Sequence, residues 1–205
     1  MKIFFDMEFT GLHQKTTPVS IGCVSECGKT FYKEFTDFDI RQVDDWQLAN
    51  LFPHTKAFKN FSKWTVEDYT EMTDVIDIPG YRKVAILQEH LKEELESWLE
   101  NEVGLDLVYS DDKIQFVSDC LAYDWVLLNE FWHGALNKPY WLNYIPIDIC
   151  TMFEMVGIDP DINRIGYSGL NLSKHNALDD ALIIKACYER LIKEHNFVNI
   201  NNDNT

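Results

Sequence analysis

Near its N-terminus the chain reads Ile3-Phe4-Phe5-Asp6-Met7-Glu8-Phe9, an apolar run with two acids inside it. The apolar residues predict a buried strand over Ile3–Phe9. Residues two apart project from the same face of a strand, so Asp6 and Glu8 point to one side. Two carboxylates on a buried strand repel each other and lose solvation unless a cation lies between them. A solvated edge strand whose acids face water is the alternative, and this run alone does not decide between the two.

Two further strands follow, Val19–Ser25 and Thr30–Phe35, joined by the turn Glu26-Cys27-Gly28-Lys29. Strands this close in sequence pair most easily in the antiparallel sense. A fourth strand is predicted at Ile114–Ser118 and a short fifth at Tyr144–Ile147. Helices are predicted at Asp44–Leu51, Lys83–Leu99, Tyr123–Trp132, Ile149–Val156 (with Asp148 as its N-cap) and Asn176–Glu194. The pattern predicts one α/β domain with a mixed central sheet.

The composition is that of a globular protein, with 46% hydrophobic residues in a chain of 205. No apolar run is long enough to span a bilayer, and the N-terminus lacks the apolar core of a secretory signal, so we expect a cytoplasmic protein without a membrane partner. The five cysteines are widely spread, and four stand in apolar surroundings, which favours buried reduced thiols over disulfides or a zinc site. They are Cys23, Cys27, Cys120, Cys150 and Cys187.

The charge is strongly acidic, with 34 Asp and Glu against 18 Lys and Arg and a net charge of −16. Proteins that grip long nucleic acids usually carry a basic stripe, because neutralised phosphates supply much of the affinity. The balance therefore argues against long substrates, but permits a pocket that holds a few terminal nucleotides through divalent ions. Five tryptophans could stack bases, although core or interface packing is their usual role. They are Trp46, Trp64, Trp125, Trp132 and Trp141.

Two more segments carry candidate polar side chains. Asp124 follows the fourth strand where the next helix begins, so it is either a helix cap or a ligand, and Asp119 is its rival. Asp180 shares a helical stripe with apolar residues of the last helix, and a carboxylate that faces the core needs a partner such as a metal. His175 precedes it by five residues, and by itself it is better explained as a surface or capping histidine.

Together these segments supply four carboxylates and a histidine, each on or near the end of a strand or helix. Carboxylate oxygens suit Mg²⁺ or Mn²⁺ and not zinc. Two such ions could clamp the attacking and leaving oxygens of a phosphodiester, and His175 could accept the proton of the attacking water.

This constellation resembles the DEDDh 3′–5′ exonucleases, the RNase T and proofreading-type superfamily. Asp6-Met7-Glu8-Phe9-Thr10-Gly11-Leu12 matches its first motif, D-x-E-x-T-G-L, and Tyr123-Asp124 matches the end of its second. His175 and Asp180 match the third, H-x4-D. Within the superfamily the chain is most similar to small bacterial and phage 3′–5′ exoribonucleases, a group that includes a mycobacterial enzyme. It departs at Asp119-Cys120, where the superfamily often has His-Asn, and at Phe9, which replaces a small polar residue.

The resemblance implies an RNase H-like fold, with a five-stranded mixed sheet flanked by helices. It implies one exonuclease domain over residues 1–200, with 54–81 as a family-variable insertion and 201–205 as a polar tail, and a possible homodimer. It also implies that Asp6, Glu8, Asp124 and Asp180 bind two Mg²⁺ or Mn²⁺ ions and that His175 is the general base. The residues implied to hold the terminal nucleotide are Met7, Phe9, Thr10 and Leu12.

The function implied is a metal-dependent 3′–5′ exoribonuclease that releases nucleoside 5′-monophosphates from single-stranded or short RNA. A DNA exonuclease of the same mechanism and a phosphodiesterase for short oligonucleotides or dinucleotides remain alternatives, because the sequence does not show the contacts to the ribose. A binding module that keeps the fold without catalysis is a third.

Overall fold

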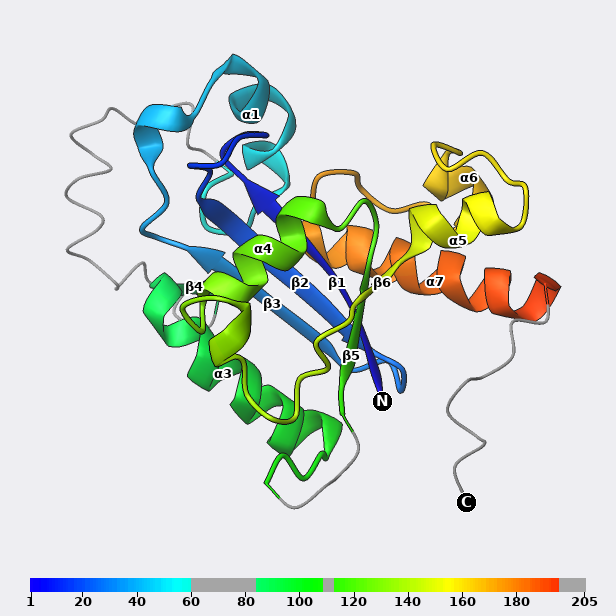
Figure 1. Cartoon of the computed structure of the whole chain (residues 1–205). Coiled ribbons are helices and arrows are strands. Elements are labelled where there is room, and N and C mark those ends of the chain that lie inside the picture. Colours follow the sequence, from blue (N-terminus) through cyan, green and yellow to red (C-terminus); the bar gives the residue numbers. More distant parts are fainter. Residues whose placement is uncertain (60–83, 109–112, 196–205) are drawn as a thin grey trace.

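The computed structural model describes residues 1–59, 84–108 and 113–195. Its strands are β1 Lys2–Phe9, β2 Pro18–Ser25, β3 Thr30–Phe35, β4 Ala85–Ile86, β5 Gln115–Ser118 and β6 Ile147–Asp148. Within the described residues these six strands form one sheet in the order β4-β3-β2-β1-β5-β6 (Figure 1). Strands β1, β2 and β3 pair antiparallel, whereas β4, β5 and β6 join in parallel. The predicted mixed sheet with three antiparallel N-terminal strands is confirmed.

Helices cover both faces of this sheet. They are α1 Asp45–Asn50, α3 Leu91–Trp98, α4 Ala122–Glu130, α5 Ile149–Met155, α6 Arg164–Ser168 and α7 Ala177–His195. Short 3-10 segments lie at Ile40–Gln42, Phe52–His54, Gln88–His90 and Ala135–Asn137, and a π-helical segment, Leu99–Val103, extends α3. In Figure 1, α3 and α4 lie across one face and α7 crosses the other. Asp148 caps α5 as predicted, since its side chain accepts a hydrogen bond from the Cys150 N–H.

The sheet has one strand more than the five predicted, and this strand replaces the start of the helix predicted at Lys83–Leu99. Ala85–Ile86 pairs in parallel with Glu34–Phe35 of β3, and the helix begins only at Leu91. The apolar spacing of this segment fits a helix, but the open edge of β3 offers backbone groups that pair with it. The tertiary contact therefore overrides the local pattern.

The predicted fifth strand at Tyr144–Ile147 is also misplaced, because β6 begins only at Ile147. Tyr144 and Ile145 are 58% and 66% exposed. Pro146 lies between them and the strand, and proline cannot donate a hydrogen bond to a sheet. Residues 60–81 of the predicted family-variable insertion, which include Trp64, and the polar tail lie outside the described residues.

The prediction of four buried thiols is wrong in number, although all five cysteines are free. Only Cys23 and Cys187 are buried, and Cys150 is partly buried. Cys27 and Cys120 are exposed because they lie in tight turns, where the backbone reverses at the surface.

No helix of the described residues is long and apolar enough to cross a membrane.

Alternation along β1 separates the core into two layers. Ile3, Phe5 and Met7 pack with α3 and α4, whereas Phe4 packs with α5, α6 and α7. Because Asp6 and Glu8 have the same parity as Phe4, they face the α7 side of the sheet. The carboxylates therefore lie on a central strand, between β2 and β5, and not at a solvated edge.

Gly22 lets α7 approach this face closely. Gly22 is paired with Asp6 across β1 and β2, and a Cβ atom at position 22 would lie 2.3 Å from the Ala177 carbonyl and the Leu178 nitrogen. Only glycine permits this approach. The first turn of α7, which carries Asp180, consequently lies directly against the strand that carries Asp6.

Candidate active site

Three of the predicted carboxylates meet on the α7 side of β1. Carboxylate oxygens of Asp6, Glu8 and Asp180 lie within 4.8 Å of one another, which is a suitable arrangement for a shared cation. Asp180 reaches them from a helical stripe whose other members, Ile184, Cys187 and Leu191, are buried in the core as predicted.

Asp124 joins this group from the first turn of α4. Its Oδ1 accepts a hydrogen bond from the backbone N–H of Met7 at 2.8 Å, and Met7 lies between Asp6 and Glu8. Asp124 is only 6% exposed and does not cap the helix, which begins after Leu121. The capping alternative is therefore wrong, and the Met7 amide fixes the position of this carboxylate.

Burial and mutual repulsion make the four carboxylates hard to ionise. Burial raises the pKa of Asp6 well above its usual range, and the nearby Asp124, Glu8 and Asp180 raise it further. Burial, followed by the charges of Asp180 and Asp124, raises the pKa of Glu8 to about 8. Burial also raises the pKa of Asp124 to about 7 and that of Asp180 to about 6. Such a set is satisfied by divalent cations, so the residues present fit a Mg²⁺ or Mn²⁺ site.

His175 lies at the same cleft, immediately before α7. Its backbone N–H donates to Oδ2 of Asp180 at 2.9 Å, and its φ of 62° is in the left-handed region that residues other than glycine rarely adopt. Asn176 takes the capping role, because its side chain accepts from the next backbone amides of α7. Partial burial lowers the pKa of His175, and nearby His54 and Lys174 lower it further.

The cleft in front of these residues has a volume of about 960 Å³. Met7, Phe9 and Leu12 line it, and Leu12 is 76% exposed. Phe9 packs against Tyr123 with ring centroids 5.6 Å apart. Thr10 is only 2% exposed, and its hydroxyl hydrogen-bonds with Gln42 Oε1 at 2.6 Å, so its side chain holds the loop in place.

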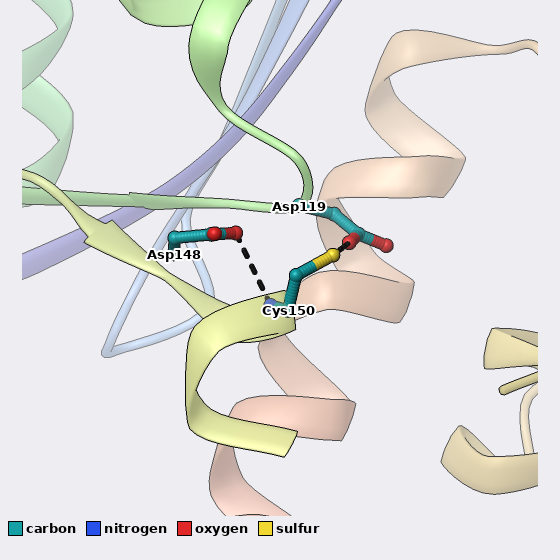
Figure 2. A group of neighbouring side chains, drawn as sticks. All are labelled: Asp119, Asp148 and Cys150. Atoms are coloured by element: carbon teal, nitrogen blue, oxygen red, sulfur yellow. Dashed lines mark hydrogen bonds between the residues drawn. The ribbon is translucent and has the colours of Figure 1, made fainter. Parts of the chain in front are cut away.

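Asp119, the rival of Asp124, belongs to a different group of side chains. Figure 2 shows it with Asp148 and Cys150: the Cys150 thiol donates to Asp119 Oδ1 at 2.9 Å, and the Cys150 N–H donates to Asp148 Oδ1 at 3.1 Å. Arg164 grips Asp119 with two hydrogen bonds, from Nε to Oδ2 at 2.7 Å and from Nη2 to Oδ1 at 2.9 Å. The remaining oxygen of Asp148 accepts from the Thr151 hydroxyl at 2.9 Å.

This second group could geometrically hold a metal, but protein donors already satisfy it. The Arg164 guanidinium supplies the positive charge that Asp119 needs, and it also donates to the carbonyls of Pro160 and Ile162 and stacks on Phe153. These contacts tie residues 160–164 to the end of β5. Asp119 and Arg164 both line the cleft, so their ion pair stabilises part of its lining.

The cleft is lined by six acids: Asp6, Glu8, Asp119, Asp124, Asp161 and Asp180. Two basic side chains, those of Arg164 and Lys174, also line it. Arg164 is engaged by Asp119, whereas Lys174 is exposed and forms no ion pair with another described residue. Neither cation stands out in the sequence, because neither belongs to a motif.

A mixed sheet whose central strand carries such an acidic group, covered by helices on both faces, is the architecture of RNase H-like nucleases. The chain belongs to the 3′–5′ exoribonuclease Rv2179c-like domain family, whose model matches residues 1–192. It is accordingly a 3′–5′ exoribonuclease, as the resemblance to the DEDDh superfamily implied.

The structure is similar to that of S. pombe Pop2p in its Mg²⁺- and Mn²⁺-bound form, with a TM-score of 0.52 and 14% identity. The match covers 95% of this chain and 83% of that one. At this identity the likeness supports the shared fold, and the predicted RNase H-like fold is confirmed. No curated protein sequence matches the chain.

Proposed function

We propose that Asp6, Glu8, Asp124 and Asp180 hold two divalent ions, Mg²⁺ or Mn²⁺, and that the enzyme removes nucleoside 5′-monophosphates from the 3′ ends of single-stranded or short RNA. The observation that carries the proposal is the convergence of these four carboxylates, one buried and three partly buried, with His175 at one cleft. When bound, such ions stabilise the charge that develops on the attacking and leaving oxygens of a phosphodiester.

His175 is the proposed general base. Its lowered pKa keeps the imidazole neutral near pH 7, so that a ring nitrogen can accept a proton from the attacking water. Its backbone N–H at Asp180 couples the position of the base to that of a proposed metal ligand. Geometry and protonation state thus both suit the role.

Leu12 and Phe9 are proposed to hold the terminal nucleotide. An exposed leucine at the mouth of a cleft offers an apolar surface to any base, and Phe9 is fixed against Tyr123. Contacts of this kind do not read sequence, which suits an enzyme that removes whichever nucleotide is last. Met7 contributes through the amide that places Asp124, and Thr10 through the loop that it stabilises.

Short or single-stranded substrates follow from the charge of the cleft. Of the two basic residues in the cleft lining, Arg164 is paired with Asp119, and Lys174 forms no ion pair with another described residue. The protein can therefore neutralise few phosphates beyond the reacting one. A duplex or a long structured RNA would meet a surface that repels its backbone.

The test is incubation with matched 3′-labelled and 5′-labelled single-stranded RNA and DNA, with Mg²⁺, Mn²⁺ or EDTA. We expect metal-dependent release of 5′-monophosphates from the 3′ end of RNA, lost in Asp6→Ala. Faster degradation of DNA than of RNA would make DNA the substrate. Activity confined to dinucleotides would make the enzyme a dinucleotide phosphodiesterase. Absence of release under all conditions would refute the proposal and favour a binding role.

A further inference from the structure

Trp46 is the residue that packs against the ring of His175. It lies in α1 and is 51% exposed. Its ring centroid is 5.0 Å from that of His175, and the planes meet at 80°. This is an edge-to-face contact, an arrangement that aromatic rings favour.

The segment that carries Trp46 is attached to both motif loops. The Gln47 side chain is buried, and its Nε2 donates to the carbonyl of Thr10 at 2.7 Å. At the other end of the segment, Asn176 Nδ2 donates to the carbonyl of His54 at 2.8 Å. The capping box of Asp44 and Gln47 fixes the start of the helix. The segment therefore bridges the first motif and the loop of His175.

The ring of His175 needs such a support. In nucleophile–histidine–carboxylate sites a carboxylate orients the imidazole through a hydrogen bond. Here no hydrogen bond from another described residue holds either ring nitrogen of His175, and the backbone at this residue is in the left-handed region. Among the described residues the ring's aromatic neighbour is Trp46, and it is held on a braced helix.

We propose that Trp46 is a positioning residue that orients the imidazole of His175 towards the cleft by edge-on packing. The inference rests on the proposed function, because it presupposes that His175 is the base. Trp46 acts through His175 and does not need to touch substrate. A 1 Å displacement of a reacting group can cost about 100-fold in rate, and a general base contributes about 100- to 10,000-fold in all.

The test compares steady-state kinetics of the wild type, Trp46→Ala, Trp46→Phe, His175→Ala and Trp46→Ala/His175→Ala on a single-stranded RNA. We expect Trp46→Ala to lower kcat about 10- to 100-fold with KM nearly unchanged. Trp46→Phe should retain most activity, because a phenyl ring can still make an edge-to-face contact with the imidazole. In the His175→Ala background, removal of Trp46 should have no further effect, since its action passes through the missing ring.

Tyr144→Ala is the matched control, because Tyr144 is also an exposed aromatic residue and lies outside the cleft lining. Thermal unfolding of each variant fixes an assay temperature at which all variants are folded. Trp46→Leu, which keeps an apolar side chain at this position of α1 but no aromatic ring, should behave like Trp46→Ala.

Three outcomes would overturn the inference: a raised KM at unchanged kcat, which would make Trp46 a base-stacking residue; equal losses in both backgrounds; or no loss in Trp46→Ala. If the His175→Ala enzyme is too slow for its rate to be measured, two other results test the inference. They are the separate effects of Trp46→Ala on kcat and KM, and the activity that Trp46→Phe retains. An inactive wild type would instead refute the proposed function itself.

Discussion

Replacing Glu8 by glutamine should stabilise the metal-free protein while abolishing its activity. Glu8 lies on a central strand, and burial with the charges of Asp180 and Asp124 raises its pKa from 4.5 to about 8. In the unfolded chain the same carboxyl loses its proton near pH 4.5. Folding at neutral pH therefore either keeps a proton on Glu8 or places a further negative charge among the other carboxylates, and glutamine avoids both costs.

The magnitude follows from linkage between protonation and folding. Each unit of pKa difference corresponds to about 1.4 kcal/mol. Because the folded pKa of Glu8 is raised, the folded state binds more protons than the unfolded state between about pH 4.5 and 8, and stability falls as the pH rises through this window. At pH 7.5 the cost reaches about 4 kcal/mol at most, and at pH 5 it is below about 1 kcal/mol.

Urea denaturation in EDTA at pH 5 and at pH 7.5 measures this effect. We expect Glu8→Gln to exceed the wild type by about 2–4 kcal/mol at pH 7.5, equivalent to a Tm higher by about 5–15 °C, and by much less at pH 5. In saturating Mg²⁺ the wild type should become more stable than Glu8→Gln, because the ion stabilises only a folded state with an intact site. Glu93→Gln, on the exposed side of α3, is the control and should change little.

Two results would refute this reasoning. The first is equal stability of the metal-free wild type and Glu8→Gln at pH 7.5, which would mean that the Glu8 carboxylate is solvated. The second is a stabilisation that does not decrease at pH 5, which would trace the effect to packing and not to charge.

Gly22→Ala should lower the free energy of unfolding, measured by urea denaturation, by at least about 1–3 kcal/mol and should also lower kcat, because the new Cβ would lie 2.3 Å from the α7 backbone. Gly166→Ala is the control and should be nearly neutral, because the nearest atom to its Cβ would lie 3.8 Å away. Lys174→Ala should reduce the slope of log(kcat/KM) against log salt by about 0.7 if this lysine neutralises one phosphate of a single strand, and an unchanged slope would exclude that contact. Asp119→Asn should leave Mn²⁺ affinity, measured by calorimetry, within a few-fold, whereas Asp124→Asn should lower it about 10-fold or more. The opposite order would make Asp119 the ligand.

The first strand and its carboxylates could be predicted because one short run contains the whole pattern. The apolar run specifies the strand, and the spacing of Asp6 and Glu8 places both on one face, whatever the rest of the chain does. Asp180 was predicted to face the core for a similar reason, since helical periodicity fixes its stripe. Local geometry suffices in these cases.

Choosing between Asp119 and Asp124 from residue patterns alone was not possible, because the choice depends on partners distant in sequence. Asp124 is placed by the amide of Met7, and Asp119 is captured by Arg164, 45 residues later. The strand β4 escaped prediction for the same reason: two residues acquire their structure from the edge of β3. A pattern within a single segment contains no information about such pairings.

The same limit applies to the residues that give this cleft its particular shape. The motif residues supply the proposed ligands and base, but Gly22 sets how closely α7 approaches the sheet, and Arg164 holds Asp119, another residue of the cleft lining. Trp46 lies on neither strand nor helix of the acidic group, yet it is the ring that meets His175. A substitution at any of these positions would leave the motifs intact and still change the distances among the reacting groups. Activity in this chain should therefore depend on the contacts that hold the motifs together as strongly as on the motifs themselves.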